Sequence, residues 1–367
     1  MQKKGLLTWV EIKKSALENN IRQFRKLVGN EVILCPCVKA NAYGHGLVEA
    51  SKIFLESGAD WLAVNALYEA RALRKADVEA PIYVLGYVAL EDLEEAVDLN
   101  LRLVVYNRET VEKLGKIGKK VKVHLKAETG NNRQGLGGDE LVNFAKFIKT
   151  FKNIEIEGLS THFANIEDTT DHSYAEKQLR EFLDLDQRLK DAGIEIKIRH
   201  CANSAATILF SETRFEMVRM GLACYGMWPS EEVKNDNLKL EPAFCWKSKI
   251  AQIKEIAAGE FVGYGCTFKT ERKTKLAIVP IGYYDGYDRG VSGKAHVLVH
   301  GKKAPVRGRV CMNIIMVDVT DIPEAGLEDE VILIGGEVTA EMFAKWAETI
   351  NYEVTTRVNE RIPRIVV

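Results

Sequence analysis

Strand-like and helix-like segments alternate through the first two thirds of the chain, and this alternation limits the fold more than any other feature. Eight runs rich in β-branched and aliphatic residues occupy positions 32–38, 61–65, 81–86, 101–106, 121–127, 154–163, 194–201 and 215–224. Most segments between them carry apolar residues at helical spacing, such as Leu141, Phe144 and Ile148. Eight βα units in succession predict an α/β fold, a (β/α)8 barrel of the TIM type, over residues 13–232.

The pattern changes after Tyr225. Residues 229–241 are polar and charged and are typical of a linker. Strand-like runs without regular helices between them follow, at 244–256, 275–281, 295–300, 314–319 and 331–334. One helix capped by Thr339 interrupts them, and a last strand is expected near 353–358. We therefore expect a mostly β domain over residues 233–367, with an N-terminal strand at 1–12 packing against it.

Charge and composition exclude several classes of function. The chain carries 51 basic and 52 acidic residues, a balance that provides no field for nucleic acid. No apolar run approaches the length of a membrane span, and the first residues lack a signal-peptide core. Seven cysteines without a disulfide-like pattern indicate reduced thiols, so we expect a cytoplasmic protein. We expect no metal, because neither His124 with Lys126 nor the acidic segment 167–172 provides a suitable ligand set.

In a barrel, chemistry gathers at the C-terminal ends of the strands. The first strand leads into Lys39 and Tyr43. Burying the charged amine of a lysine at the exit of a buried strand costs free energy, so such a lysine is expected to have a function. One use is covalent, because a desolvated amine loses its proton and attacks a carbonyl. The ends of the fifth to eighth strands add further candidates, which are Lys126, Glu128, Arg133, His162, Asn203, Ser204, Arg219, Gly221 and Leu222.

A phosphate site is expected after the last two strands. Ser204 offers a hydroxyl, and Gly221 and Leu222 offer backbone N–H groups, at the place where barrels often bind phosphate. A lysine on the first strand together with this site fits pyridoxal phosphate. It fits equally a sugar-phosphate aldolase that forms a Schiff base with lysine, and these residues leave both readings open.

Motifs along essentially the whole chain resemble those of alanine racemases. In the first domain they are VKANAYGHG (38–46), TGNNR (129–133), HFA (162–164), CANS (201–204) and VRMG (218–221). In the second they are GYG (263–265), PIGYYDGY (280–287), GRVCM (308–312) and NYEV (351–354). Each motif is short, but their order and spacing across two domains make the resemblance specific.

The resemblance implies a pyridoxal-phosphate enzyme that interconverts L-alanine and D-alanine and supplies D-alanine for bacterial peptidoglycan. Lys39 would hold the cofactor and act as one acid/base, and Tyr264 would be the other on the opposite face. Racemisation removes a proton from one face and returns one to the other, so two such groups suffice. His162 would bond to Tyr264, and Arg219 would bond to His162 and to the pyridine nitrogen.

The resemblance also assigns binding residues and an assembly. Residues implied to bind the cofactor are Lys39, Tyr43, Asn203, Ser204, Arg219, Gly221, Leu222 and Tyr352. Residues implied to meet the substrate are Arg133, Met312 and Tyr283. The family forms head-to-tail homodimers, so each site would take Lys39 from one chain and Tyr264 and Met312 from the other.

Some positions depart from the family pattern. Asn313 and Glu128 stand where aspartate is common, and Asn131 replaces a methionine. These changes leave the preference for alanine over serine open. Lys126 occupies a position that is carbamylated in some members.

Two other classes of protein fit the sequence less well. Non-catalytic pyridoxal-phosphate carriers are single barrels, and the β domain with Tyr264 argues against one. Barrel decarboxylases of basic amino acids are typically longer and carry other motifs.

Overall fold

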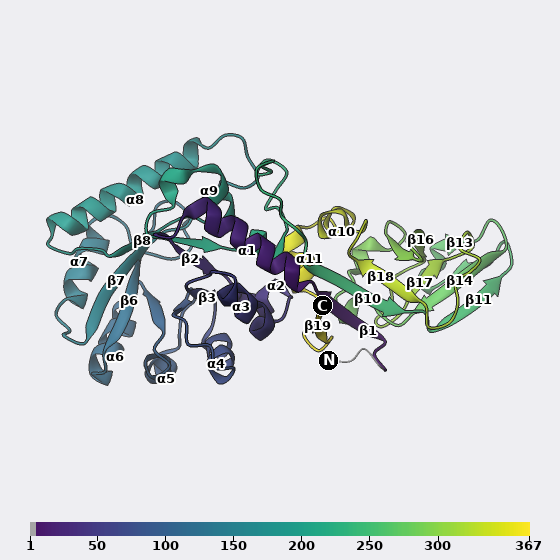
Figure 1. Cartoon of the computed structure of the whole chain (residues 1–367), viewed down its shortest axis with the longest axis horizontal. Helices are drawn as coiled ribbons and strands as arrows, with labels where there is room; N and C mark the ends of the chain where they lie inside the picture. Colours follow the sequence, from purple (N-terminus) through teal and green to yellow (C-terminus); the bar gives the residue numbers. More distant parts are fainter. Residues whose placement is uncertain (1–4) are drawn as a thin grey trace. The chain divides into compact units, whose positions relative to one another are not determined.

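The chain of the computed structural model divides into two units (Figure 1). The barrel unit comprises Ala16–Ala42 and Leu47–Glu241, and the β unit comprises Met1–Ser15, Tyr43–Gly46 and Pro242–Val367. The structure describes residues 5–367, so positions 1–4 of the strand expected at 1–12 lie outside the described residues. Within the described range, no helix combines the length and the apolar character needed to cross a membrane.

Eight parallel strands form the barrel, in the order that the sequence predicts. They are β2 (Ile33–Pro36), β3 (Leu62–Val64), β4 (Ile82–Val84), β5 (Arg102–Val105), β6 (Val121–Lys126), β7 (Ile154–Ser160), β8 (Ile198–His200) and β9 (Met217–Met220). Strands β3 to β8 make one parallel sheet, and β2 pairs with β9. A bridge from Cys37 to Ala63 joins β2 to β3, and the Arg219 N–H donates to Ala202 O at 3.0 Å next to β8. The predicted (β/α)8 barrel is therefore confirmed.

Helices surround these strands, as Figure 1 shows for α4 to α9. The helices are α1 (Lys14–Val28), α2 (Lys39–Tyr43), α3 (Leu47–Glu56), α4 (Leu67–Lys75), α5 (Leu93–Asp98), α6 (Arg108–Ile117), α7 (Gly138–Ile148), α8 (Ser173–Asp191) and α9 (Ser204–Leu209). Helix α6 illustrates the local rules. Asn107 caps it by accepting from the Thr110 N–H at 2.9 Å, and Gly118 ends it with a φ of 73°. Its apolar residues Val111 and Leu114 are fully buried. Burial of each side chain stabilises the folded state by about 1.5–3 kcal/mol relative to exposure.

The β unit is built on a nine-stranded sheet with the order β11-β14-β17-β16-β15-β18-β10-β1-β19. These strands are β1 (Thr8–Ile12), β10 (Phe244–Lys249), β11 (Gln252–Ile256), β14 (Thr274–Val279), β15 (His296–Val299), β16 (Lys302–Arg307), β17 (Ile315–Asp318), β18 (Glu330–Ile334) and β19 (Arg364–Val366). A separate hairpin pairs β12 (Phe261–Val262) with β13 (Phe268–Lys269). Strand β1 lies between β10 and β19 and pairs with both, and β19 forms one edge of this sheet.

The last strand expected near 353–358 is wrong, because this segment forms helix α11 (Asn351–Thr356). The run Val354-Thr355-Thr356 is β-branched and favours a strand locally, but Val354 and Thr355 are buried on one helical turn, and packing overrides propensity. The helix expected after Thr339 is confirmed as α10 (Ala340–Ala347), whose Met342 N–H donates to Thr339 Oγ1 at 3.1 Å.

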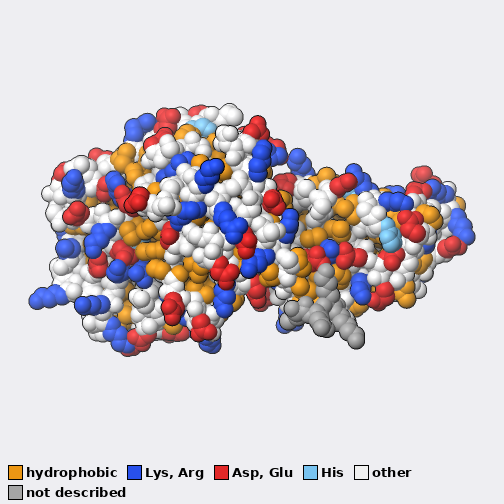
Figure 2. Space-filling view, in the orientation of Figure 1, with side chains coloured by type: hydrophobic (Ala, Val, Ile, Leu, Met, Phe, Trp, Pro, Cys, Tyr) orange, Lys and Arg blue, Asp and Glu red, His pale blue; other side chains and the backbone are white. Residues whose placement is uncertain are grey.

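Charged side chains are mixed over the surface. On the face drawn in Figure 2, basic and acidic groups alternate without a continuous area of either sign. This distribution agrees with the nearly equal numbers of basic and acidic residues in the sequence.

Candidate active site

Lys39 opens a left-handed turn. Ala40, Asn41 and Ala42 each have a φ of 53°, with ψ values of 53°, 46° and 52°. This conformation costs roughly 1–2 kcal/mol for each residue that is not glycine. Backbone strain of this kind collects at functional sites, where the surroundings must hold it in place.

A buried carboxylate holds the turn from α4. Glu69 is 1% exposed, and its Oε1 accepts the Ala40 N–H at 2.7 Å. Its Oε2 accepts the N–H groups of Asn65 and Ala66 at 2.7 and 3.0 Å, after the end of β3. Inside the turn, Asn41 Oδ1 accepts the Leu47 N–H at 2.8 Å. The backbone that follows Lys39 is therefore fixed by polar contacts that compensate for its strain.

Arg219 lies at the end of β9, 5% exposed. Its Nη1 donates to His200 Nδ1 at 2.6 Å and to His200 O at 2.8 Å. Its Nη2 donates to Thr161 O at 2.7 Å and to Cys201 O at 3.3 Å, and lies 3.5 Å from His162 Nδ1. Among residues 5–367, no carboxylate lies within hydrogen-bond distance of this guanidinium. A buried arginine held only by neutral acceptors is a permanent donor.

His162 and Lys126 lie in the field of several cations. Burial lowers the pKa of His162 well below its usual range, and the charges of Arg219, Lys126, Arg133 and Lys39 lower it further. Burial, together with Arg219 and Arg133, also lowers the pKa of Lys126 to about 7. His162 is therefore neutral at physiological pH, and the barrel unit brings these four cationic side chains around it.

The expected phosphate residues meet after β8 and β9. Ser204 Oγ accepts the Gly221 N–H at 2.8 Å, which leaves the hydroxyl proton of Ser204 available. Leu222 follows at the start of the short helix η3 (Leu222–Tyr225). Asn203 is already engaged, since its Oδ1 caps Ala206 N–H at 2.9 Å and its Nδ2 donates to Glu167 Oε1 at 2.8 Å.

The loop after β6 carries the residues expected near the substrate. Burial raises the pKa of Glu128, but backbone N–H groups of residues 130–133 outweigh this and lower it. Glu128 is therefore ionised and organises the loop, while the Arg133 side chain is exposed. Asn131 donates to His162 O at 3.3 Å, which links the loop to the end of β7.

Residues of the β unit form two groups. The rings of Tyr43 and Tyr352 lie 6.1 Å apart. Tyr283 and Met312 also come together, because the Tyr283 N–H donates to Cys311 O and the Tyr284 N–H donates to Met312 O, both at 3.0 Å. Gly282 permits this approach, since a Cβ there would lie 2.2 Å from Cys311 O.

Tyr264 stands apart from both groups. It opens the short helix η4 (Tyr264–Cys266) between Gly263 and Gly265, whose φ values are 74° and 73°. Its side chain is 72% exposed within the single chain.

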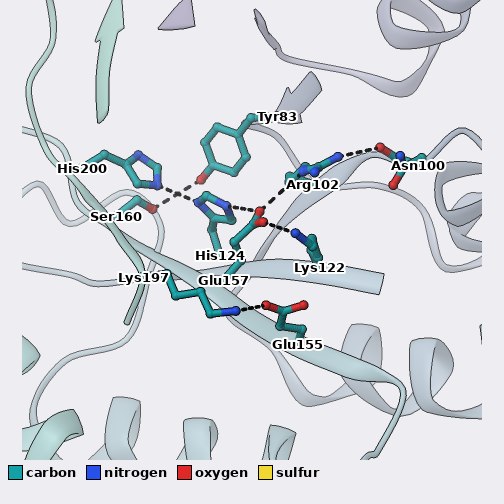
Figure 3. A network of polar contacts seen from close by, with 10 residues as sticks. All are labelled: Tyr83, Asn100, Arg102, Lys122, His124, Glu155, Glu157, Ser160, Lys197 and His200. Carbon is teal, nitrogen blue, oxygen red and sulfur yellow. Dashed lines mark hydrogen bonds and ion pairs between the residues drawn. The ribbon is translucent and has the colours of Figure 1, made fainter. Parts of the chain in front are cut away.

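Sequence reasoning missed a buried polar network inside the barrel (Figure 3). The sequence alone gives no reason to expect His200 or Glu157 in a site, and it predicts Tyr83 only as part of a strand. His124 was considered only as a metal ligand. A signal was present in β6, where Lys122, His124 and Lys126 occupy alternate positions of a strand that should be apolar.

Comparisons with known proteins agree with this architecture. The family model for the alanine racemase N-terminal domain matches residues 12–229, and that for the C-terminal domain matches residues 243–366. An alanine racemase of Desulforamulus reducens is 42% identical, over 98% of this chain and 98% of its own. One of Methanococcus maripaludis is 41% identical, over 97% and 98%.

Solved structures are similar over the same extent. Alanine racemase of Clostridium difficile 630 superposes with a TM-score of 0.96 at 37% identity, covering 100% of this chain and 97% of that one. Alanine racemase of Bacillus anthracis with bound L-Ala-P gives a TM-score of 0.93 at 38% identity, covering 98% and 95%. Family models, relatives and folds agree along the whole length, and the chain belongs to the alanine racemase family.

Proposed function

We propose that this protein interconverts L-alanine and D-alanine with pyridoxal phosphate held on Lys39. The setting of Arg219 carries the proposal, together with membership of the family. A guanidinium held by imidazole and carbonyl acceptors can donate a hydrogen bond to a pyridine nitrogen without giving up its proton. An arginine so placed keeps the ring nitrogen neutral, which limits side reactions such as transamination.

The residues of the barrel unit fit this cofactor. Lys39 would supply the amine for the covalent link, and Arg219 would donate a hydrogen bond to the ring nitrogen. Ser204 and Leu222 would hold the phosphate, with the Gly221 N–H fixing the Ser204 oxygen, and the family resemblance adds Tyr43 and Tyr352 to these residues. When bound, the cofactor supplies an electron sink that acidifies the α-C–H of an amino acid.

Lys39 and the partner subunit's Tyr264 exchange the α-proton from opposite faces. His162 supports Tyr264 in a defined way. Because Arg219 faces His162 Nδ1 and the ring is neutral, the His162 proton sits on Nε2. That N–H donates to the Tyr264 oxygen and holds it in position for proton transfer.

A racemisation assay in deuterated water tests the reaction. Purified protein with pyridoxal phosphate and L-alanine should lose optical rotation to zero, with one solvent deuteron entering Cα for each inversion. Deuterium exchange without inversion would mean that only one face is served. No exchange at all would refute the proposed activity.

We further propose a head-to-tail homodimer in which Lys39 of one chain meets Tyr264 and Met312 of the other. The exposure of Tyr264, Tyr284 and Met312, at 72, 53 and 55%, supports this arrangement. Several large side chains exposed on the same unit are typical of a surface that another chain covers.

Complementation tests the shared site. Lys39→Ala and Tyr264→Phe proteins are each nearly inactive, and they are unfolded and refolded together. About half of the dimers are then mixed, and each mixed dimer holds one site with both defects and one intact site, so roughly a quarter of normal activity returns. Absence of recovery, with mixed dimers shown to form, would rule out the shared site.

Carbamylation of Lys126 is part of the proposal. An amine whose pKa is about 7 is largely unprotonated above neutrality and can react with carbon dioxide. The carbamate would carry a negative charge in the field of Arg219 and Arg133, whose charges disfavour a protonated lysine there. The proposed role of the reaction is to supply D-alanine for peptidoglycan. Its proposed location is the cytoplasm.

A further inference from the structure

A line of polar side chains runs through the barrel interior from Glu157 to Arg219. Arg219 Nη1 meets His200 Nδ1 at 2.6 Å, and His200 Nε2 meets His124 Nδ1 at 2.7 Å. His124 Nε2 then meets Glu157 Oε2 at 3.2 Å (Figure 3). The line begins near the N-terminal ends of the strands, where Lys122 Nζ donates to Glu157 Oε1 at 2.6 Å. It ends at the guanidinium beside the candidate active site.

A β-bulge places the carboxylate on this line. Val123 pairs with Ile156, but His124 pairs with Gly158, so Glu157 is an extra residue without a partner on β6. Gly158 makes room for the imidazole, because a Cβ there would lie 2.4 Å from His124 Nδ1. Both imidazoles are fully buried and Glu157 is 4% exposed. The bulge at Glu157 and the absence of a side chain at Gly158 therefore bring the Glu157 carboxylate to the buried His124 ring.

The proton positions along the line follow from Arg219. A guanidinium only donates, so His200 Nδ1 must accept and the His200 proton sits on Nε2. That N–H donates to His124 Nδ1, and the His124 proton on Nε2 donates to Glu157. Burial lowers the pKa of both imidazoles, as does the charge of Arg219, and in His124 this outweighs the raising effect of Glu157, so each ring carries one proton. Burial opposes ionisation of Glu157, but His124, Lys122 and Arg102 lower its pKa to about 2.

We propose that Glu157 and His124 are positioning residues for the racemase: the carboxylate at the far end of the barrel fixes, through two imidazoles, the His200 tautomer that accepts from Arg219. The opposite tautomer would set an N–H of His200 against an N–H of Arg219 at 2.6 Å. The guanidinium would then have to move. The effect on catalysis rests on the proposed function, whereas the tautomer itself does not.

A simpler role must be separated from this one. Glu157 also pairs with Lys122 and lies 3.4 Å from Arg102 Nε, so it could serve stability alone. Such a role would be indifferent to the tautomer of His200.

Glu157→Gln distinguishes the two roles. Lys122 only donates, so the amide must turn its oxygen to Lys122 and its NH2 to His124. His124 then has to accept at Nε2, and the direction of the whole line reverses against Arg219. Adding Lys122→Met frees the amide oxygen to accept from His124, and the original direction returns. Glu155→Gln is the matched control, since Glu155 lies on the same strand as Glu157 but pairs with Lys197 (Figure 3), and its replacement leaves the line intact.

The measurement is 15N NMR of histidine side chains in the full-length protein as purified, with His200 and His124 assigned by substitution. Wild type and Glu155→Gln should show both rings protonated at Nε2 only. Glu157→Gln should show protonation at Nδ1 or exchange between tautomers, and the double variant should return to the wild-type pattern. In parallel, kcat/KM for alanine should fall about 10- to 100-fold in Glu157→Gln and largely recover in the double variant.

Each result decides the proposal. An Nδ1–H on His200 in the wild type would overturn it, whatever Glu157→Gln shows. A fall in kcat/KM with an unchanged tautomer, or a double variant that does not recover, would overturn it in favour of a purely stabilising role. If the tautomers behave as expected but the wild type does not racemise alanine, the proposed function fails and the assignment of the line stands.

Discussion

Replacing Gly158 with alanine should displace His124. The φ of Gly158 lies outside the left-handed region, so only the contact with its neighbour opposes a side chain there. The new Cβ would lie 2.4 Å from Nδ1 and 2.7 Å from Cε1 of His124, far inside van der Waals contact. The ring is held between His200 and Glu157, so it cannot move without losing one of these hydrogen bonds.

The expected loss of folding stability in Gly158→Ala has two contributions. Overpacking in a core costs about 1–3 kcal/mol. Loss of a buried hydrogen bond of His124 adds about 0.5–1.5 kcal/mol, and more if the bond to the Glu157 carboxylate is the one lost. We therefore expect Gly158→Ala to destabilise the protein by roughly 2–4 kcal/mol. In a His124→Ala background the same change should cost far less, because the opposing ring is absent.

A double-mutant cycle measures this difference. Urea unfolding of the wild type, both single variants and the double variant is followed by tryptophan fluorescence, for which Trp61, 6.0 Å from the His124 ring, is a local probe. The coupling should exceed about 1 kcal/mol, whereas independent sites add within about 0.5 kcal/mol. Gly115→Ala is the matched control, since its Cβ would meet Phe151 at 2.2 Å, away from the line, and its cost should add independently to that of His124→Ala. Additive effects of Gly158→Ala and His124→Ala would refute the steric argument.

Three further outcomes are expected. Lys39→Ala should abolish racemisation and the covalent cofactor link, and a borohydride-fixed adduct in the purified variant would contradict the assignment. Arg219→Glu should favour a protonated ring nitrogen, so racemisation should slow while a long-wavelength absorption band and transamination products appear; an unchanged spectrum would exclude a role at that nitrogen. The lowered pKa of Lys126 means that the folded state binds fewer protons than the unfolded state between pH 7 and its ordinary value, so wild-type stability should rise with pH in that range relative to Lys126→Met. Parallel unfolding midpoints of the two proteins from pH 6 to 10 would contradict it.

The barrel could be predicted because its strands are buried on both faces and appear as separate apolar runs. The eight runs all correspond to strands, from β2 to β9. The β unit was harder to predict. Strand β16 contains Lys302, Lys303, Pro305 and Arg307 and has no apolar run, while β-branched residues of α11 favour a strand that packing does not allow.

The candidate site also has a part that the sequence predicts and a part that it does not. Residues at strand ends could be listed from the sequence, but two features could not. The left-handed turn after Lys39 contains no glycine, so no local signal predicts it, and it depends on Glu69 from a distant helix. The line from Glu157 to Arg219 joins residues on separate strands, with His124 and His200 76 positions apart. Only closure of the barrel brings such residues together.

The line also shows how one site can orient a cation without neutralising it. A carboxylate beside Arg219 would hold the guanidinium, but it would also attract a proton to any base nearby, including a pyridine nitrogen. Neutral acceptors avoid this, yet a neutral imidazole has two tautomers, and only one of them accepts from arginine. Placing the carboxylate two imidazoles away selects the tautomer while keeping the negative charge at the opposite end of the barrel. Orientation and charge are thereby controlled by different residues, and the Glu157 carboxylate can act on Arg219 without touching it.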